Sequence, residues 1–209
     1  MSKFDPVRVL ALLSCAMLPV LASSTVVQGA EVAPDQPIYY ANCQSGIAVI
    51  FPGQSKQPQT RDIRYTIPFY ANNRSAREFY IERGGNRYSV IVVDFSDGPR
   101  SDEEIVEQAA AELRKTGEVR FQAFADYDPG MPGRQLNIFK PNNRQLRASI
   151  YMAYHKMVIT QADAVVGDND GIIFEQSIVL VDTDGTDIDR VNGQDGTGAE
   201  PLRKFPCAR

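Results

Sequence analysis

The sequence is poor in the residues that most hydrolytic and metal sites use. It has no tryptophan and a single histidine, His155, in 209 residues. A hydrolytic triad or a zinc site needs a histidine with suitable partners, whereas His155 and Lys156 stand between two apolar runs and are expected at a tight turn. No Gly-x-Ser-x-Gly elbow, phosphate-binding loop or His-Glu-x-x-His motif occurs in the chain. The sequence therefore favours binding over catalysis.

A concentrated positive charge is also missing. The chain has 22 lysines and arginines against 26 aspartates and glutamates, which gives a net charge of −4 at pH 7. Nucleic acids and anionic lipids are bound by concentrated basic faces. Because the chain has no basic cluster, we predict that no nucleic acid is its partner.

Long apolar runs are scarce, and the one near the start is short. It covers residues 9–22, about 14 residues, whereas a membrane-spanning helix needs roughly 20. A basic head over residues 1–8 precedes the run, and small residues follow it up to Ala30. This three-part pattern is typical of a secretory signal peptide. We predict that residues 1–30 are cleaved off after Ala30, with cleavage after Ala22 as the alternative.

A cleaved signal would place the mature chain in the periplasm or outside the cell. Removal of Lys3, Arg8 and Asp5 changes the net charge from −4 to −5, and no later run is long and apolar enough to span a bilayer. Two alternatives are an uncleaved membrane anchor and a lipoprotein modified at Cys15. Against the second, Cys15 lies inside the apolar run, whereas a lipid-bearing cysteine normally closes it.

The cysteines support export. Cys15 leaves with the signal, so the mature chain keeps Cys43 and Cys207. A single pair in an oxidising compartment is most simply a disulfide. It would close a loop of about 164 residues and stabilise the fold by on the order of 5 kcal/mol in the chain-entropy model. Two unrelated thiols are the alternative.

Alternation of apolar and polar residues predicts a sheet-rich domain. Pro68 inside one run indicates an edge strand, because proline cannot donate to the ladder. Gly84-Gly85-Asn86 indicates a tight turn between two others. The expected strands are 47–51, 63–69, 78–82, 88–95, 119–124, 134–139, 146–154, 157–161 and 177–181.

Two segments change to helical spacing. Ser101 and Glu104 fit a capping box, and apolar residues then recur at helical intervals until Gly117, which predicts a helix over 101–116. A shorter helix is expected over 168–174. The longer helix has one apolar stripe and a charged back, so we interpret it as a cover for the sheet.

The order of several short motifs resembles one known family. Phe51-Pro52-Gly53 ends the first strand, Tyr88-Ser89-Val90 opens the most apolar strand, and Pro132-Gly133-Arg134 opens a later one. Over about 46–180 the chain resembles the PsbP/Mog-type superfamily, whose bacterial members include DcrB-like envelope proteins. The resemblance implies an α+β fold: an antiparallel sheet of six or more strands with helices on both faces, an α-β-α sandwich. It also implies a function through protein contacts, with no shared active site.

The predicted organisation has four parts. They are a signal peptide at 1–30, an extended lead-in at 31–45, the α+β domain at 46–181 and an acidic, Gly- and Asp-rich tail at 182–209. The disulfide is expected to pin the tail. Because the tail and the cysteine pair depart from the family pattern, no partner can be transferred from relatives.

The tail contains the best candidate for a cation site. Asp182, Asp184, Asp187 and Asp189 surround Gly185, and carboxylates so spaced can wrap a calcium ion, which takes six to eight oxygens. The register is not that of an EF-hand loop, because the glycine comes at the fourth position instead of the sixth. A solvated acidic loop is the alternative, since Asp-Gly turns are common on structural grounds. Apart from this weak calcium candidate, we predict no cofactor and no catalytic residue.

Together these observations predict an exported, non-catalytic binding or chaperone-like module of the bacterial envelope. We expect its partner to be another envelope protein. Two alternatives stay open at this stage. One is a calcium-dependent envelope protein, and the other is a hydrolase that uses paired carboxylates, which needs a deep acidic cleft with two carboxylates close together.

Overall fold

The structure is a computed structural model that describes residues 36–53, 57–66, 73–96, 101–188 and 203–208. All of them belong to one compact unit. The predictions of a signal peptide, of its cleavage site and of a lipid at Cys15 lie outside the described residues. Among the described helices, none is long and apolar enough to cross a membrane.

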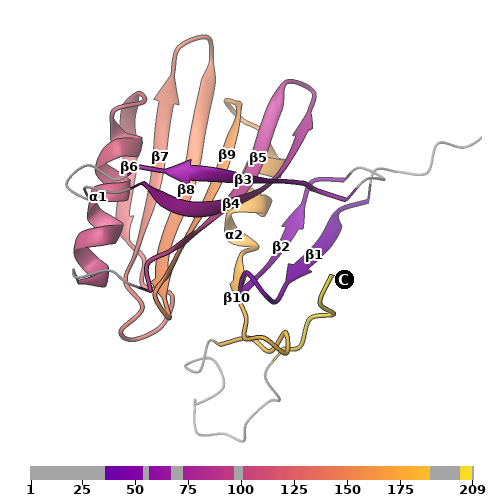
Figure 1. Ribbon diagram of the computed structural model, residues 1–209. Helices are drawn as coiled ribbons and strands as arrows, with labels where there is room; N and C mark the ends of the chain where they lie inside the picture. The colour runs from indigo at the N-terminus through magenta and orange to yellow at the C-terminus, as the bar shows by residue number, and fades with distance from the viewer. Residues whose placement is uncertain (1–35, 54–56, 67–72, 97–100, 189–202, 209) are drawn as a thin grey trace, which may run out of the picture. The chain divides into compact units, whose positions relative to one another are not determined.

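A seven-stranded antiparallel sheet forms the centre of the unit (Figure 1). Its strand order is β3-β4-β5-β9-β8-β7-β6. Strands β3 to β5 form one group and β6 to β9 another, and the two groups join where β5 pairs with β9. Strand β3 lies at one edge, as predicted, although it begins and ends earlier than expected, and Pro68, on which that prediction rested, lies outside the described residues. The strands are β3 (Gln59–Tyr65), β4 (Arg74–Arg83), β5 (Asn86–Asp94), β6 (Glu118–Phe124), β7 (Gly133–Lys140), β8 (Arg144–Ala153) and β9 (Lys156–Val165).

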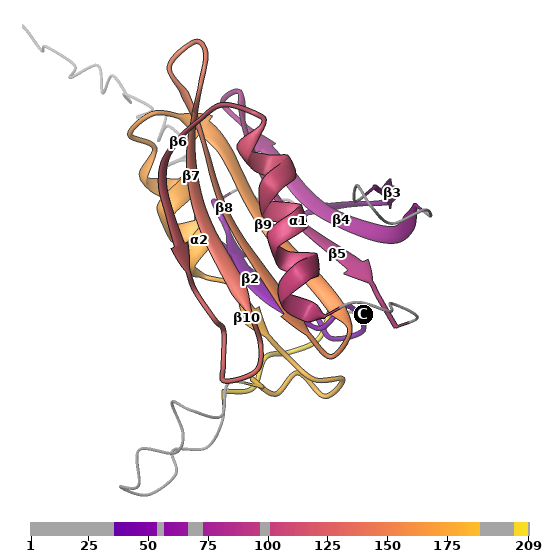
Figure 2. The same cartoon turned by 90° about the vertical axis from the view of Figure 1, so that its left-hand side faces the viewer.

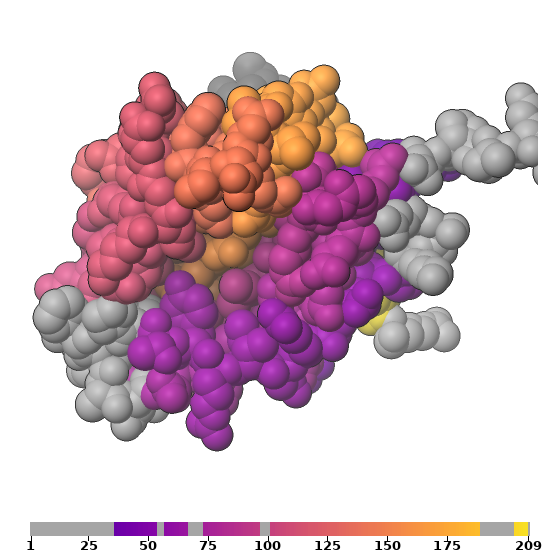
Figure 3. Space-filling view, turned by 90° about the horizontal axis from the view of Figure 1, so that it is seen from above, coloured from indigo at the N-terminus to yellow at the C-terminus, as the bar shows by residue number. Residues whose placement is uncertain are grey.

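Tight turns connect the paired strands. Gly84 and Gly85 link β4 to β5 with positive φ angles of 55° and 79°, as the glycine pair predicted. Between β8 and β9 the two turn residues are Tyr154 and His155, with φ angles of 47° and 61°. The turn is therefore one residue earlier than the predicted His155-Lys156 pair, and Lys156 is the first residue of β9. The β4–β5 and β7–β8 turns lie at the same end of the sheet, which Figure 3 views from above.

A second, three-stranded sheet draws on both ends of the described chain. It consists of β1 (Ile38–Asn42), β2 (Ile47–Phe51) and β10 (Val179–Leu180), in the order β1-β2-β10 and all antiparallel. The segment predicted as an extended lead-in thus supplies a strand, β1. We call this the small sheet.

Helix α1 (Asp102–Arg114) covers one face of the seven-stranded sheet (Figure 2). The side chain of Ser101 accepts a hydrogen bond from the Glu104 N–H at 3.3 Å, which confirms the predicted cap. Five buried residues form its apolar stripe and pack with side chains of β5, β7, β8 and β9. Those helix residues are Ile105, Val106, Ala109, Ala110 and Leu113.

The opposite face is covered by the small sheet together with the eight-residue helix α2 (Asn169–Gln176). Asp168 caps α2 and accepts hydrogen bonds from the Gly171 N–H and the Tyr88 hydroxyl, both at 2.8 Å. Burial, together with this bond to Asp168, raises the pKa of Tyr88. Phe174 of α2 is fully buried between the rings of Phe51 and Tyr88.

The predicted α+β class and the antiparallel sheet of six or more strands are confirmed. The finer expectation, an α-β-α sandwich with helix layers on both faces, is not supported. Most of the second layer is sheet, because the inner side chains of β1 and β2 complete the core where a layer of helices was expected. Alternation in the sequence identified β2 as a strand but did not indicate that it belongs to a separate sheet.

Candidate binding groove

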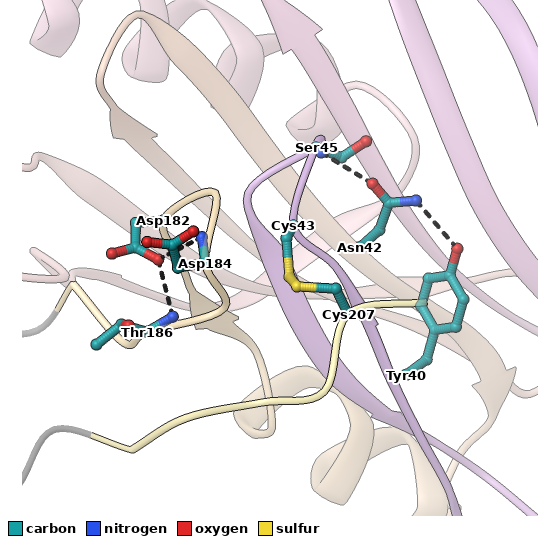
Figure 4. Close-up of a disulfide and its surroundings, with 8 residues drawn as sticks. All are labelled: Tyr40, Asn42, Cys43, Ser45, Asp182, Asp184, Thr186 and Cys207. Carbon is teal, nitrogen blue, oxygen red and sulfur yellow. Dashed lines mark hydrogen bonds between the residues drawn. A yellow bond between two sulfur atoms is a disulfide. The ribbon is translucent and has the colours of Figure 1, made fainter. Parts of the chain in front are cut away.

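A disulfide joins Cys43, just after β1, to Cys207 near the end of the chain (Figure 4). The two Cα atoms lie 5.5 Å apart, and the bond spans 164 residues of sequence, as the cysteine count predicted. We call residues 203–208 the strap, because they run across the outer face of the small sheet. The disulfide agrees with an oxidising compartment.

Backbone hydrogen bonds hold the strap along its length. The Phe205 N–H donates to the Gly185 carbonyl at 2.8 Å, and the Asp187 N–H donates to the Arg203 carbonyl at 2.9 Å. At the far end, the Ala208 N–H donates to the Ala41 carbonyl of β1 at 2.7 Å. The strap therefore connects the loop after β10 to the outer edge of β1.

Gly185 allows the close approach of this loop to the strap. Its φ angle is 79°, a conformation that favours glycine. A Cβ atom at this position would lie 2.3 Å from the Phe205 carbonyl oxygen and 3.2 Å from both sulfur atoms of the disulfide. A side chain at residue 185 would push the strap away.

The strap covers a small apolar cluster on the outer face of the small sheet. Its buried members come from β1, β2, β10 and the residues beside them, and Phe205 of the strap packs against them half-buried. Without the strap this face would be exposed. The buried members are Ala41, Cys43, Ala48, Val179 and Val181.

Two of the four aspartates predicted as cation ligands, Asp182 and Asp187, have other roles in the described structure. The Asp182 carboxylate accepts hydrogen bonds from the N–H groups of Asp184 and Thr186, both at 2.9 Å, and so shapes its own turn (Figure 4). Asp189 lies outside the described residues. Within the described ranges, no three histidine, cysteine or acidic residues come together as a metal site would require. Calcium binding stays a prediction that this geometry does not favour.

Asp187, the remaining member of that set, is buried and paired with the strap. Its side chain is 4% exposed and accepts two hydrogen bonds from the Arg203 guanidinium, at 2.7 and 3.0 Å. Its other oxygen accepts from the Tyr127 hydroxyl at 3.2 Å. Tyr127 in turn accepts from the Leu180 N–H at 3.0 Å. Asp187 thus ties the strap to β10 and to the β6–β7 connection.

A groove opens on the outer face beside the strap. It consists of two hollows of about 290 and 270 Å³, and Tyr39 of β1 and Ile50 of β2 border both of them. We call the two hollows together the Tyr39 groove. The first is closed by Ile178, Phe205 and Pro206, and the second by Pro52, Ile173 and Phe174.

The walls of the groove are apolar and its charged rim is paired. The Tyr39 side chain is 75% exposed and Ile173 of α2 is 56% exposed, so both are open to a partner. At the rim, Arg83 pairs with Asp170 at 2.9 Å, and Arg203 pairs with the buried Asp187. A partner would therefore meet apolar surface with little net charge in its centre.

Tyr39 and the groove beside it were not identified from the sequence. Tyr39 falls in the segment interpreted as an extended lead-in, where periodicity is weak. The adjacent pair Tyr39-Tyr40 was the usable signal, because neighbours in a strand point to opposite faces. Tyr40 packs inward against the rings of Phe51 and Phe79, which leaves Tyr39 on the outside.

A larger hollow, about 620 Å³, lies elsewhere, between β3, β4 and the loop after β1. It contains Asp62 and Asp94, the kind of pair that a carboxylate hydrolase would need. Asp62, however, accepts a hydrogen bond from Arg77 at 3.0 Å. The Ser96 backbone N–H, together with the charges of Lys156 and Arg74, lowers the pKa of Asp94. A general acid requires the opposite shift, so this hollow does not favour the hydrolase alternative.

A further buried carboxylate, Glu175, belongs to packing. It is 1% exposed and accepts hydrogen bonds from the Gln135 amide at 2.7 Å and from the Ser149 hydroxyl. Arg147 lies 3.6 Å away. These contacts fasten α2 to β7 and β8 and thereby position one wall of the Tyr39 groove.

Comparison with known proteins gives similarity of fold only. No protein-family model matches the chain, and no curated protein matches it in sequence. The solution structure of PsbP from the cyanobacterium Synechocystis is similar with a TM-score of 0.44 and 13% identity, over 74% of this chain and 98% of that one. A Pseudomonas aeruginosa protein of unknown function is similar with a TM-score of 0.33 and 15% identity, over 54% of this chain and 86% of that one. These scores are too low to assign a family or a function.

Proposed function

We propose that this protein is an exported binding module of the bacterial envelope that captures another envelope protein in the Tyr39 groove. The observation that carries the proposal is Tyr39 itself, which projects 75% exposed between two apolar hollows. Single exposed aromatic residues are common on protein surfaces, but an exposed ring that borders two apolar hollows is typical of an interaction site. Tyrosine is among the residues that contribute most to protein interfaces when they fill pockets on a partner.

The rigidity of the groove supports the same proposal. One wall is the strap, which the disulfide and Arg203 hold in place, and the other is α2, which the buried Glu175 fastens to the main sheet. A preformed site loses less conformational entropy when a partner binds. The groove is therefore preformed, as is typical of a recognition surface.

The envelope location rests on sequence and chemistry together. The signal-like first 30 residues predict export, and the disulfide suits an oxidising compartment. The motif resemblance to the PsbP/Mog-type superfamily, with its DcrB-like envelope members, agrees with a function through protein contacts. A bacterial envelope protein is accordingly the class of partner that we expect.

The test is site-specific photo-cross-linking in cells, with p-benzoylphenylalanine in place of Tyr39. The matched control places the same group at Phe124, which is also strongly exposed but lies on β6, beside Arg134 on the α1 side of the sheet. We expect one reproducible envelope protein to be captured from position 39 and not from position 124. Identical captures from both positions would contradict the proposal.

A binding measurement with the purified partner completes the test. Tyr39→Ala should weaken the affinity by about tenfold or more, because truncation of an interface anchor commonly costs above 1 kcal/mol. Tyr154→Ala, which removes an exposed tyrosine from the β8–β9 turn, serves as the control. Equal affinity of the Tyr39→Ala variant and the unmodified protein would rule out the groove as the site.

A further inference from the structure

Strand β1 presents an open backbone edge beside the groove. On its inner side β2 binds it, and the register pairs Tyr39 with Ile50. The N–H of Ile50 donates to the Ser177 side chain at 2.9 Å, on the side of β2 that faces β10. In an antiparallel pair, the backbone N–H and C=O groups of two directly opposed residues either hydrogen-bond to each other or both point away from the partner strand. The N–H and C=O of Tyr39 therefore point outward, away from β2.

The strap confirms this direction and limits the open stretch. Ala41 has the same outward orientation as Tyr39, and its carbonyl accepts the Ala208 N–H at 2.7 Å. The edge of β1 thus already pairs with an extended segment at Ala41. At Tyr39, neither backbone group has a hydrogen-bond partner within the described ranges. Pro37, two residues earlier, has no N–H to donate, so Tyr39 is the centre of the open edge.

We propose that the partner's contribution is an extended peptide segment that adds to the outer edge of β1 at Tyr39. This inference rests on the proposed function and specifies how the groove is used. One residue of the segment exchanges both backbone hydrogen bonds with Tyr39. Its neighbours at alternate positions place apolar side chains on the outer face, next to the Tyr39 ring. Addition of a strand to an exposed edge is a common mode of peptide recognition.

An extended segment fits this edge better than a helix or a second copy does. A helix has already bonded its own backbone groups and cannot satisfy the outward N–H and C=O of Tyr39. A second β1, placed antiparallel and centred on Tyr39, would set its Pro37 opposite Ala41. Pro37 has no N–H to donate, and the Ala41 carbonyl is already bonded to Ala208. The chain's own strap shows that a peptide strand can lie along this edge.

The test uses linear peptides selected from a displayed library on the immobilised, oxidised protein. A selected peptide is then resynthesised with each backbone amide N-methylated in turn, which removes one donor and leaves the side chains unchanged. We expect a loss of affinity of about tenfold or more at amides that face β1, and much smaller effects at the intervening amides, since the lost bond leaves the Tyr39 carbonyl unpaired. The amide hydrogen of Tyr39 should also exchange more slowly with the peptide bound.

Each outcome separates this inference from the proposed function. Peptides whose binding needs Tyr39 but tolerates every N-methylation would leave the groove as the site and overturn the added strand. Peptides whose binding survives Tyr39→Ala would count against the groove itself. A selection that returns no peptide, or a concentration-dependent dimer that shields the Tyr39 amide, would also overturn the proposed occupant.

Discussion

The guanidinium of Arg203 donates two hydrogen bonds to one oxygen of the buried Asp187 carboxylate, at 2.7 and 3.0 Å. This pair joins the strap to the loop after β10. The Arg203 side chain is 65% exposed, whereas Asp187 is 4% exposed. Arg203 is thus largely solvated, whereas Asp187 is not. Loss of the contact would leave the buried carboxylate with two fewer hydrogen bonds.

Replacement of Arg203 should destabilise the protein measurably. We expect Arg203→Ala to lower the free energy of unfolding by about 1–3 kcal/mol, because it removes two hydrogen bonds from a buried carboxylate. Urea denaturation measures this change. The control is Lys115→Ala, which breaks a more exposed pair with Glu112 and should change stability by less than about 1 kcal/mol. Equal effects of the two variants would contradict the role given to Asp187.

The strap should also respond to a methyl group at residue 185. Gly185→Ala brings a Cβ against the Phe205 carbonyl and the disulfide, whereas Gly130→Ala, at a similar φ of 81°, meets nothing within 4 Å. Both variants carry the backbone strain of a positive φ, roughly 1 kcal/mol. Only Gly185→Ala should lose more than this and make the disulfide more easily reduced. Thermal melting and the rate of reduction by dithiothreitol measure the two effects.

Proline substitution in β1 distinguishes the outward N–H groups from those that face β2. Each proline variant is compared with alanine at the same position, so that loss of the ring cancels. Tyr39→Pro should cost little beyond Tyr39→Ala, because the Tyr39 N–H faces outward. Tyr40→Pro should cost about 1–3 kcal/mol beyond Tyr40→Ala, because the Tyr40 N–H faces Val49 of β2. Melting temperatures of the four variants decide this, and the reverse order would show that the register was misassigned.

Asp163 gives a prediction for acid pH. Burial raises its pKa, but hydrogen bonds from Lys140 and Arg144 outweigh burial and hold the pKa below its usual value of 3.8. A carboxylate whose pKa is lowered by folding stabilises the protein above its unfolded-state pKa, and this contribution is lost as the pH falls through the folded-state pKa. We expect Asp163→Asn to be less stable than the unmodified protein at pH 7. The difference should shrink below about pH 4, as urea denaturation across pH can measure.

The local elements of the fold were predictable because their signals lie within a few residues. The cap at Ser101, the apolar stripe of α1, the alternation in β2 and the Gly84-Gly85 turn all depend on neighbours in the chain. The boundaries of some elements differ from the predicted ones by a residue or more, as at the β8–β9 turn. There the turn residues with positive φ are Tyr154 and His155, one residue earlier than the predicted His155-Lys156 turn.

The candidate site was not predictable, because long-range pairing creates it. Ile50 and Ser177 are 127 residues apart and meet only when β10 joins β2. For the same reason the sequence left the acidic tail open between a cation site and a solvated loop. Nothing near Asp187 in the sequence shows that its carboxylate turns inward to Arg203, 16 residues later. The cysteine pair was the exception, since two cysteines leave one pairing.

The small sheet takes two strands from the beginning of the described chain and one from near its end. During synthesis, the seven-stranded sheet and α1 can therefore assemble before the recognition surface is complete. The last residues, with Cys207 among them, supply both the wall of the groove and its covalent fastening. A chain that stops short of Val179 would contain every strand of the main sheet but would lack β10 and the strap, which line the larger of the two hollows of the Tyr39 groove. Complete binding competence thus requires a segment that is synthesised after every strand of the main sheet.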